Sequence, residues 1–552
     1  MALHDTDLSF DPRDPYFPVP GGSEVEWAVQ VFTTDNGYGL DADRAQVGTT
    51  ADGVRVRCDR YARLGQQVPA GSGEVEVQVR EDDVLEWVIE VSCSEPIKSV
   101  KLLLRGLPEE PLRRGWWTPS TGRGWTHGAD LRRFQLEYPG PDWPTPWVAA
   151  GDEAGGLVLA VRDPQLHRQI LHVHRPSYAT GPVVELVHVP AASARTTSYR
   201  VPPVRLRPST TPSTVDSDLR EHMSFVEEST RLETWDSRDD VPDWLRDVAL
   251  VVTLHGQHWT GYVFNDFARM AEELRFVAQH IPPHRVLAYL TGWEGRYYHD
   301  YPQYRPGADL GGEAGFAELV DTAHRLGMHV MPMFGGHGAN VNRYPAWEQA
   351  VIRNDTNRYV ELLNRPDWDS DRIGEGDQVF LNPGEPGFRN HLVRSILALV
   401  RDFGIDAAFL DTLGYWFNDP RFPLLNGYRQ LAAELHHQAP HLVLATEGWW
   451  DALMAIFPLC QQWLGVDRDL RKPWVLTDYA RTTGHLAEGT PGPGSTGVHE
   501  KGFLPRPPDV ARPGHIPVLG FADTTLEQHA EEVAEICRWA AEHAPAAELD
   551  QP

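Results

Sequence analysis

The sequence predicts a protein of the α/β class in which an antiparallel β-sandwich domain precedes a (β/α)8 TIM-like barrel. Up to about residue 206, apolar and polar residues alternate in many short segments that Gly and Pro interrupt. From about residue 243, continuous apolar runs alternate with amphipathic helical segments instead. The first pattern is typical of antiparallel strands that bury one face, and the second is typical of parallel strands that helices cover.

Residues 1–206 are predicted to form the sandwich domain. The alternation is clearest where Val75, Val77 and Val79 are interspersed with polar residues, and it recurs at 24–31 and 85–91. Successive side chains of a strand point to opposite faces, so one face of each segment is apolar. Residues 207–242 are predicted to be a linker followed by a connector helix, because Arg207–Ser217 is rich in Pro, Ser and Thr.

Residues 243–552 are predicted to form the barrel, with an insertion at 340–387 after the third strand. Five strand and helix units fit within 247–450, and the apolar run 516–521 with its following helix is predicted to close the ring. The sixth and seventh strands are poorly marked, and 461–466 is a candidate for one of them. An open doubly wound sheet is the alternative, but no glycine-rich phosphate loop follows any of these strands.

Two acidic residues directly follow apolar strands in this half of the chain. Asp411 ends the fourth predicted strand and Glu447 ends the fifth. Reacting groups of barrel enzymes lie at the carboxyl ends of strands, and neighbouring strands are about 5 Å apart. That spacing suits the carboxylate pair of a retaining glycoside hydrolase. The alternative is that both acids cap the following helices or pair with arginines.

Aromatic and polar residues are concentrated at the same predicted strand ends. Aromatic rings offer flat apolar faces to a sugar, and polar groups bind its hydroxyls. The alternative for each Trp is core packing, and for the two His it is ordinary loop packing. The candidate substrate-binding residues are His258, Trp259, Trp293, Glu294, His337, Tyr415, Trp416, Trp449 and Trp450.

Composition and charge exclude several classes of partner. The formal net charge is −28, which disfavours nucleic acid and anionic membrane surfaces as partners. Four scattered cysteines are too few for a disulfide framework or a CxxC metal site, so buried free thiols are expected. The first residues lack the pattern of a signal peptide, and no apolar run is long enough to span a membrane. We therefore expect a cytoplasmic protein with no cofactor and no metal in its active site.

Three segments resemble a known family. Residues 301–334, 381–414 and 444–448, together with the domain order, resemble the retaining α-glycosidase superfamily that includes the α-amylases. The likeness is closest to endo-α-N-acetylgalactosaminidases and related uncharacterised bacterial barrel proteins. The resemblance implies that the N-terminal half is a β-supersandwich, that Asp411 is the nucleophile and that Glu447, 36 positions later, is the acid/base.

The sequence departs from this family at two points. The α-amylases have an Arg two residues before the nucleophile and a His shortly after it, where this chain has Phe409 and then Tyr415 and Trp416. The difference argues against α-glucan hydrolysis of the amylase type. Related α-galactosidases and α-glucosidases take their acid from the sixth strand, and Asp467 is the alternative acid here. Glu447 is preferred because it lies directly at a strand end.

These observations predict a retaining glycoside hydrolase, an α-glycosidase that acts on small oligosaccharides or glycosides through a covalent glycosyl-aspartate intermediate. One alternative is a metal-dependent hydrolase that uses His255, His258 and His337. Another is a non-catalytic carbohydrate-binding protein. The sequence leaves the sugar, its linkage, exo or endo action and the oligomeric state open, and a homo-oligomer is compatible with it.

Overall fold

The chain forms two compact units, Met1–Arg231 and Leu232–Pro552. The structure is a computed structural model that describes residues 16–20, 24–63, 71–80, 83–118, 126–127, 134–140, 143–152, 155–176, 181–209, 212–258, 261–358, 378–461, 478–483 and 514–543. Among the helices in these ranges, none has the length and apolarity that crossing a membrane requires.

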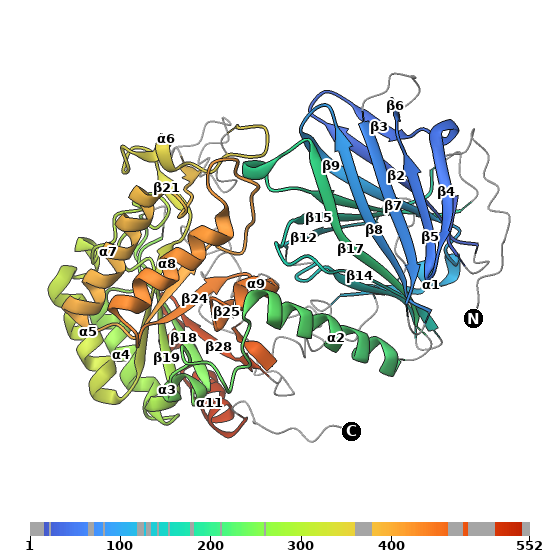
Figure 1. Cartoon of the computed structure of the whole chain (residues 1–552). Helices are drawn as coiled ribbons and strands as arrows, with labels where there is room; N and C mark the ends of the chain where they lie inside the picture. Colours follow the sequence, from blue (N-terminus) through green and yellow to red (C-terminus); the bar gives the residue numbers. More distant parts are fainter. Residues whose placement is uncertain are drawn as a thin grey trace. The chain divides into compact units, whose positions relative to one another are not determined.

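The first unit is a sandwich of two antiparallel sheets (Figure 1). One sheet has the order β12-β15-β16-β9-β2-β3-β6, with β1 beside β2. Its strands are β1 (Phe17–Pro18), β2 (Glu26–Thr33), β3 (Gly37–Leu40), β6 (Tyr61–Arg63), β9 (Ile97–Arg105), β12 (Phe134–Tyr138), β15 (Arg168–His174) and β16 (Val183–Val189). The alternation predicted at 24–31 is confirmed in β2, since Trp27, Val29 and Val31 are buried while Glu26 and Gln30 are half-buried.

The second sheet of the sandwich has the order β11-β10-β13-β14-β17-β8-β7-β5-β4. Val75 and Val77 are fully buried, as the alternation predicts. The helix α1 (Glu109–Arg114) lies in the same unit. The strands are β4 (Ala45–Thr50), β5 (Gly53–Cys58), β7 (Gly71–Val79), β8 (Leu85–Cys93), β10 (Gly115–Trp117), β11 (Thr126–His127), β13 (Trp147–Asp152), β14 (Gly155–Val161) and β17 (Ser198–Ser209).

The segment predicted as a linker and connector helix contains the end of β17 and helix α2. Strand β17 continues through Arg207 to Ser209, and helix α2 runs from Pro212 to Thr230. Pro is favourable at the start of a helix because its φ is already helical and its missing N–H has no partner there. Further along, Leu219, Met223 and Val226 recur at helical spacing and are buried. The helix therefore begins within the stretch that is rich in Pro, Ser and Thr.

The second unit contains the predicted barrel. Its sheet has the order β27-β26-β25-β24-β23-β20-β19-β18-β28, and every pairing is parallel. β27 and β28 are consecutive in the chain and are separated only by Pro517, which has no N–H to donate. They stand at the two ends of the strand order, so this single segment closes the ring. The strands are β18 (Leu250–His255), β19 (Val286–Thr291), β20 (His329–Gly335), β23 (Ala407–Asp411), β24 (Val443–Glu447), β25 (Leu459–Gln461), β26 (Arg481–Thr483), β27 (His515–Ile516) and β28 (Val518–Phe521).

Helices cover the outside of these strands (Figure 1). Asp266 caps α4 by accepting a hydrogen bond from the Arg269 N–H at 2.8 Å, and α7 begins at Pro386 and ends before Gly404, which adopts a left-handed conformation. The helices are α3 (Asp243–Arg246), α4 (Phe267–Val277), α5 (Gly312–Leu326), α6 (Trp347–Ala350), α7 (Pro386–Phe403), α8 (Leu424–Gln438), α9 (Asp451–Met454) and α11 (Thr525–His543). Strands β21 (Gly338–Asn340) and β22 (Gln378–Phe380) pair antiparallel, and most of the predicted insertion lies between them in the sequence.

Two smaller predictions can be compared directly. The sixth strand, β25, ends at Gln461 and so shares only that residue with the predicted 461–466, of which 462–466 lie outside the described residues. All four cysteines are buried free thiols, as predicted.

Candidate active site

The barrel brings Asp411 and Glu447 into contact. They are the last residues of neighbouring strands β23 and β24, in which Leu410 pairs with Thr446. The Thr412 N–H donates to Oε2 of Glu447 at 3.1 Å, and the side chains of Glu447 and Asp411 are hydrogen-bonded to each other. The predicted meeting of two carboxyl groups from adjacent strand ends is therefore present. The Asp411–Glu447 pair is the centre of the candidate site.

Burial controls the charge of this pair. Asp411 is 5% exposed, and its burial raises the pKa of the carboxyl group to about 6. Hydrogen bonds from Glu447, Tyr298 and the Thr412 N–H act in the opposite direction and offset only part of this effect. Two carboxylates in contact repel each other when both are ionised, so a proton shared between them stabilises the pair.

The backbone turns sharply just beyond both strand ends. Thr412 has φ 65°, and Gly448 has φ 75°. A non-glycine residue in this left-handed region costs free energy, and such residues persist where the surrounding structure holds them. The turn at Thr412 directs its N–H towards Glu447, so the strained conformation positions the second carboxyl group.

A tyrosine-rich loop after β19 supplies further groups that the sequence analysis did not select. Tyr298 of this loop hydrogen-bonds to Asp411. Tyr289 lies in strand β19 itself and is buried. Burial raises the pKa of Tyr289 most, and the charges of Asp411 and Glu447 raise it further. Tyr304 donates to the Gly335 carbonyl at 2.9 Å. Four tyrosines within residues 297–304, directly after a strand end, were the signal that could have identified this loop.

Glu294 from the same loop is an unusual buried acid. It is 7% exposed, and within the described part of the chain neither of its carboxyl oxygens has a hydrogen-bond partner. Burial, and next the charges of Asp300 and Asp411, raise its pKa well above the ordinary value. The Tyr301 hydroxyl is also buried without a hydrogen-bond partner among those residues. Buried polar groups without partners are costly, and a bound ligand with hydroxyl groups would satisfy them.

The histidines at the strand ends do not form the metal site of the alternative hypothesis. His255 and His258 are buried, with ring centroids 6.2 Å apart, and each ring lies 5.8 Å from the ring of Tyr297. His337 uses both ring nitrogens elsewhere: Nδ1 is 2.7 Å from the Leu381 carbonyl oxygen and Nε2 is 2.6 Å from the Tyr428 hydroxyl. In the described ranges these three histidines do not place their nitrogens together as metal ligands.

The hydrogen bonds of His337 favour the packing alternative over a role as a sugar ligand. The ring is fully buried, and burial lowers its pKa to about 4, so it is neutral. A neutral imidazole has one donor and one acceptor, and Leu381 and Tyr428 use both. His337 therefore connects its loop to Leu381 and to Tyr428 of helix α8.

Three of the candidate tryptophans are core residues. Trp293 is fully buried, donates to the Met333 carbonyl at 2.7 Å and packs against Phe316 and Phe334, which favours core packing over substrate binding. Trp449 and Trp450 are also buried, 6% and 0% exposed, which favours the packing alternative for both.

Two aromatic residues remain accessible beside the carboxyl pair. Tyr415 is 39% exposed, and Asp411 and Glu447 are close enough for their charges to raise its pKa, although burial contributes more. Trp416 is partly buried next to it. Tyr415 is the accessible ring best placed to meet a sugar. Trp259 and the alternative acid Asp467 lie outside the described residues.

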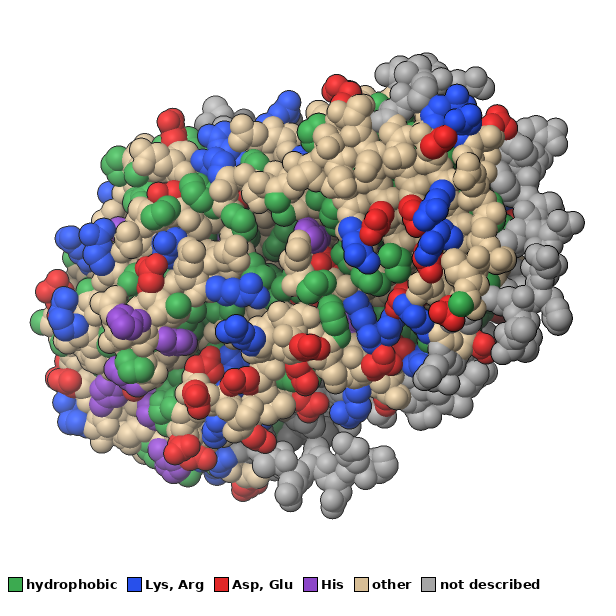
Figure 2. Space-filling model, viewed as in Figure 1, with side chains coloured by type: hydrophobic (Ala, Val, Ile, Leu, Met, Phe, Trp, Pro, Cys, Tyr) green, Lys and Arg blue, Asp and Glu red, His purple; other side chains and the backbone are tan. Residues whose placement is uncertain are grey.

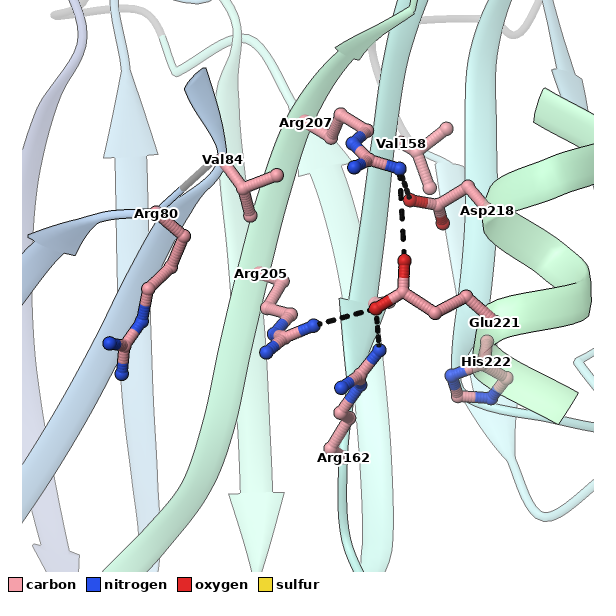
Figure 3. A pocket seen from close by; sticks show the side chains of 10 residues that line it. Arg80, Val84, Val158, Arg162, Arg205, Arg207, Asp218, Glu221 and His222 are labelled. Carbon is pink, nitrogen blue, oxygen red and sulfur yellow. Dashed lines mark hydrogen bonds and ion pairs between the residues drawn. The ribbon is translucent and has the colours of Figure 1, made fainter. Parts of the chain in front are cut away.

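A separate hollow of about 430 Å³ lies in the first unit, between the sheet that contains β14 and β17 and the helix α2 (Figure 3). Its walls carry charged pairs rather than aromatic faces. Arg162 and Arg205 bind Glu221, and Arg207 binds Asp218 at 3.0 Å. Since these cations and anions neutralise one another, the network holds α2 against the sheet and is not part of the candidate active site.

Comparisons with known proteins identify the fold. No protein-family model matches the sequence, and no curated protein matches it either. Among solved structures, the quadruple mutant of α-N-acetylgalactosaminidase NagBb from Bifidobacterium bifidum matches with a TM-score of 0.68, 14% identity, and coverage of 97% of this chain and 91% of that chain. The GalNAc complex of NagBb matches with a TM-score of 0.66, 15% identity, and coverage of 96% and 89%.

A third similar structure is the galactosidase domain of the α-galactosidase–sucrose kinase AgaSK. It matches with a TM-score of 0.50, 12% identity, and coverage of 94% of this chain and 71% of that chain. At these identities the likeness concerns the fold. The chain has the sandwich-plus-barrel fold of these glycosidase structures.

Proposed function

We propose that the protein is a retaining α-glycosidase that removes a terminal α-linked sugar of the galactose configuration from a small glycoside. The observation that carries the proposal is the contact of Asp411 and Glu447 at neighbouring strand ends. Such a pair supplies the nucleophile and the acid/base that glycoside hydrolysis with retention requires. The choice of sugar rests on the names of the similar structures, an α-N-acetylgalactosaminidase and an α-galactosidase domain.

The proposed reaction has two steps. The ionised Asp411 attacks the anomeric carbon while Glu447 gives its proton to the leaving oxygen, which breaks the glycosidic bond and forms a glycosyl-aspartate. Glu447 then takes a proton from water, whose oxygen displaces Asp411 and releases the sugar. The Tyr298 hydroxyl hydrogen-bonds to Asp411 and favours its ionised form in the free enzyme.

Substrate entry is proposed to break the hydrogen bond between the two carboxyl groups. Retaining enzymes place the two groups on either side of the bond that is cleaved. The anomeric carbon and the glycosidic oxygen would occupy the opened space. The proton shared by the free pair is then carried by Glu447, which leaves Asp411 ionised for attack.

Substrate recognition is assigned to the unsatisfied groups around the pair. Burial raises the pKa of Glu294 well above its ordinary value, which favours the protonated form. A protonated carboxyl group can both donate to and accept from uncharged hydroxyl or acetamido groups. Tyr301 adds a buried hydroxyl, and Tyr415 offers an exposed ring. A neutral sugar suits this set because it adds no charge to a site that already holds several acids.

The roles of the two acids can be separated with aryl α-glycosides. Asp411→Asn should reduce turnover of every substrate to background. Glu447→Gln should lose roughly 10²–10⁴-fold on substrates with poor leaving groups and far less on those with good leaving groups, which need no protonation. Asp402→Asn, an exposed ion-paired acid near the end of α7, is the matched control and should keep wild-type activity.

The alternative acid is tested in the same assay. If Asp467→Asn shows the dependence on leaving group and Glu447→Gln behaves like wild type, the acid/base assignment is wrong. If the wild type cleaves no member of a broad α- and β-glycoside panel but binds a sugar calorimetrically, the non-catalytic binding protein replaces the proposal.

A further inference from the structure

Three potential metal ligands converge on one face of the first unit, within the sheet that contains β15 and β16. His172 and His174 are two positions apart on β15, so their side chains leave the same face of the strand. Glu185 on β16 lies directly opposite His172 in the antiparallel register. The intervening Val173 is buried on the other face, against the core. The fold therefore holds the three side chains together on a half-buried surface.

The distances between these groups fit a metal ion. His174 Nε2 is 3.1 Å from Oε1 of Glu185, and His172 Nδ1 is 3.5 Å from Oε2. Two ligands bound to Zn²⁺ at about 2.0–2.1 Å and a tetrahedral angle are about 3.3–3.4 Å apart. The two imidazole rings are stacked, with centroids 4.5 Å apart and planes 5° from parallel, and the ligand atoms all lie within 4.8 Å of one another.

We propose that His172, His174 and Glu185 form a binding site for one divalent transition-metal ion of the zinc type, with water as the fourth ligand. Two imidazoles and one carboxylate are a donor set that such ions prefer over Mg²⁺ or Ca²⁺. The site shares no residue with the Asp411–Glu447 pair, and it stands independently of the proposed glycosidase activity.

The three ligand side chains are partly exposed: 29% for His172, 21% for His174 and 13% for Glu185. An ion can therefore reach them from solvent while the sheet holds the strands that carry them.

Lys101 competes with the metal for this carboxylate. Its Nζ lies 2.8 Å from Oε2 of Glu185, so the ammonium group neutralises Glu185 when no metal is bound. Oε1 of Glu185 faces His174 instead, so it can coordinate the ion while Oε2 keeps its ion pair with Lys101. The positive charge of Lys101 nevertheless repels a divalent ion. Its removal should strengthen metal binding, an effect opposite to that of removing a ligand.

The test uses the full-length protein, stripped with a chelator and titrated with Zn²⁺ by isothermal calorimetry, with metal content measured after dialysis. The wild type should bind one Zn²⁺ with a Kd in the micromolar range or tighter, and bound Zn²⁺ should raise the Tm of the stripped protein. His172→Gln and His174→Gln should each weaken binding at least 10-fold. Lys101→Met should strengthen it several-fold, and Mg²⁺ should not compete.

The control is His437→Gln, which removes an exposed histidine at the end of α8 and should leave the Kd unchanged. The proposal is overturned if the wild type binds no stoichiometric Zn²⁺, or if both histidine variants bind as tightly as the wild type with native circular dichroism. A Lys101→Met variant that binds no more tightly than the wild type would also contradict it. Lys101→Met keeps all three ligands, so it tests the site even if a ligand variant fails to fold.

Discussion

Tyr298 and Asp411 show how single groups set the chemistry of the candidate site. Asp411 must be ionised to act as a nucleophile, yet its burial at the strand end raises its pKa to about 6. The Tyr298 hydroxyl opposes this rise because it hydrogen-bonds to the carboxylate. The tyrosine is therefore expected to determine where the acidic limb of the pH–rate profile lies.

Replacing Tyr298 with Phe should move the acidic limb of the pH–rate profile to higher pH. The wild-type kcat/KM is expected to fall as the pH drops through about 6, because protonation of Asp411 removes the nucleophile. A hydrogen bond to a charged group contributes roughly 1.5–3 kcal/mol, so the limb of Tyr298→Phe should shift upward by about one pH unit or more. The measurement is kcat/KM between pH 4 and 9 on an aryl glycoside.

Tyr304→Phe provides the matched control for this shift. Its hydroxyl donates to the Gly335 carbonyl rather than to Asp411, so the acidic limb should stay in place. An unchanged profile for Tyr298→Phe would show that the hydroxyl does not control the ionisation of Asp411.

For single residues, the sequence indicates which residue types follow a strand, but not the direction in which their side chains point. Asp411 and Glu447 could be predicted because an acid that ends an apolar strand is recognisable in the chain. Trp293 also follows a strand end, but its side chain turns into the core and bonds to Met333, and no pattern beyond the strand reveals that direction. Tyr298 was missed because its position depends on a left-handed backbone conformation at φ 61°, which composition does not predict.

Helix α4 buries an acid that should make the barrel sensitive to pH. Glu273 is fully buried, and the nearest cation, Nε of Arg269, is 3.5 Å away. Burial raises the pKa of Glu273 to about 8. Between pH 4.5 and 8 the folded state therefore binds more protons than the unfolded state, and its stability falls as the pH rises through this window.

Glu273→Gln should remove this dependence. The variant is expected to be more stable than the wild type above pH 8, by on the order of a few kcal/mol, and to lose most of the advantage at pH 4.5. Melting curves at the two pH values measure the difference. The exposed neighbour Glu272 serves as the control, because Glu272→Gln should change Tm little at either pH. The same Tm shift at both pH values would show that Glu273 does not titrate in this window.

Helix α2 is held to the sandwich by a largely buried acid. Asp218 accepts a hydrogen bond from Nε1 of Trp147 at 2.7 Å. It accepts another from Arg207 at 3.0 Å, which Figure 3 marks with a dashed line. Glu221, one turn later, binds Arg162 and Arg205 but is half exposed. Solvent screens the Glu221 pairs more effectively than those of Asp218, so the two acids should differ in their effect on stability.

Asp218→Ala should lower the free energy of unfolding of the first unit by about 2–3 kcal/mol, because it removes the acceptor of two largely buried hydrogen bonds. Glu221→Gln should cost less than about 1 kcal/mol. Urea denaturation followed by tryptophan fluorescence measures both values. Equal losses for the two variants would contradict the assignment of Asp218 as the main attachment of α2.

The elements themselves could be predicted where they are long and regular. The buried parallel strands β18, β19 and β20 have six or seven residues each and stand out as apolar runs. β25 and β26 have three residues each, too few for a recognisable pattern, so the sixth and seventh strands were poorly marked. The start of the predicted connector helix could not be located from the sequence for a different reason, since Pro and Ser are as typical of a helix start as of a loop.

For the whole molecule, charge and fold agree with a neutral small substrate. The chain carries a net charge of −28, and on the face in Figure 2 the Lys and Arg side chains of the described residues stand among Asp and Glu. The carboxyl pair lies at the carboxyl ends of the barrel strands, where enzymes of this architecture place their reacting groups. The sandwich-then-barrel order and the adjacency of the two strands that carry Asp411 and Glu447 were foreseeable from the sequence, whereas the identity of the sugar was not.

The stereochemistry of hydrolysis tests the central claim most directly. The wild type and Asp411→Asn would be incubated with aryl α-N-acetylgalactosaminide and aryl α-galactoside, and the first-formed sugar followed by proton NMR before mutarotation. The account predicts that the wild type releases the α-anomer first and that Asp411→Asn releases none. Initial release of the β-anomer, or undiminished cleavage by Asp411→Asn, would contradict it.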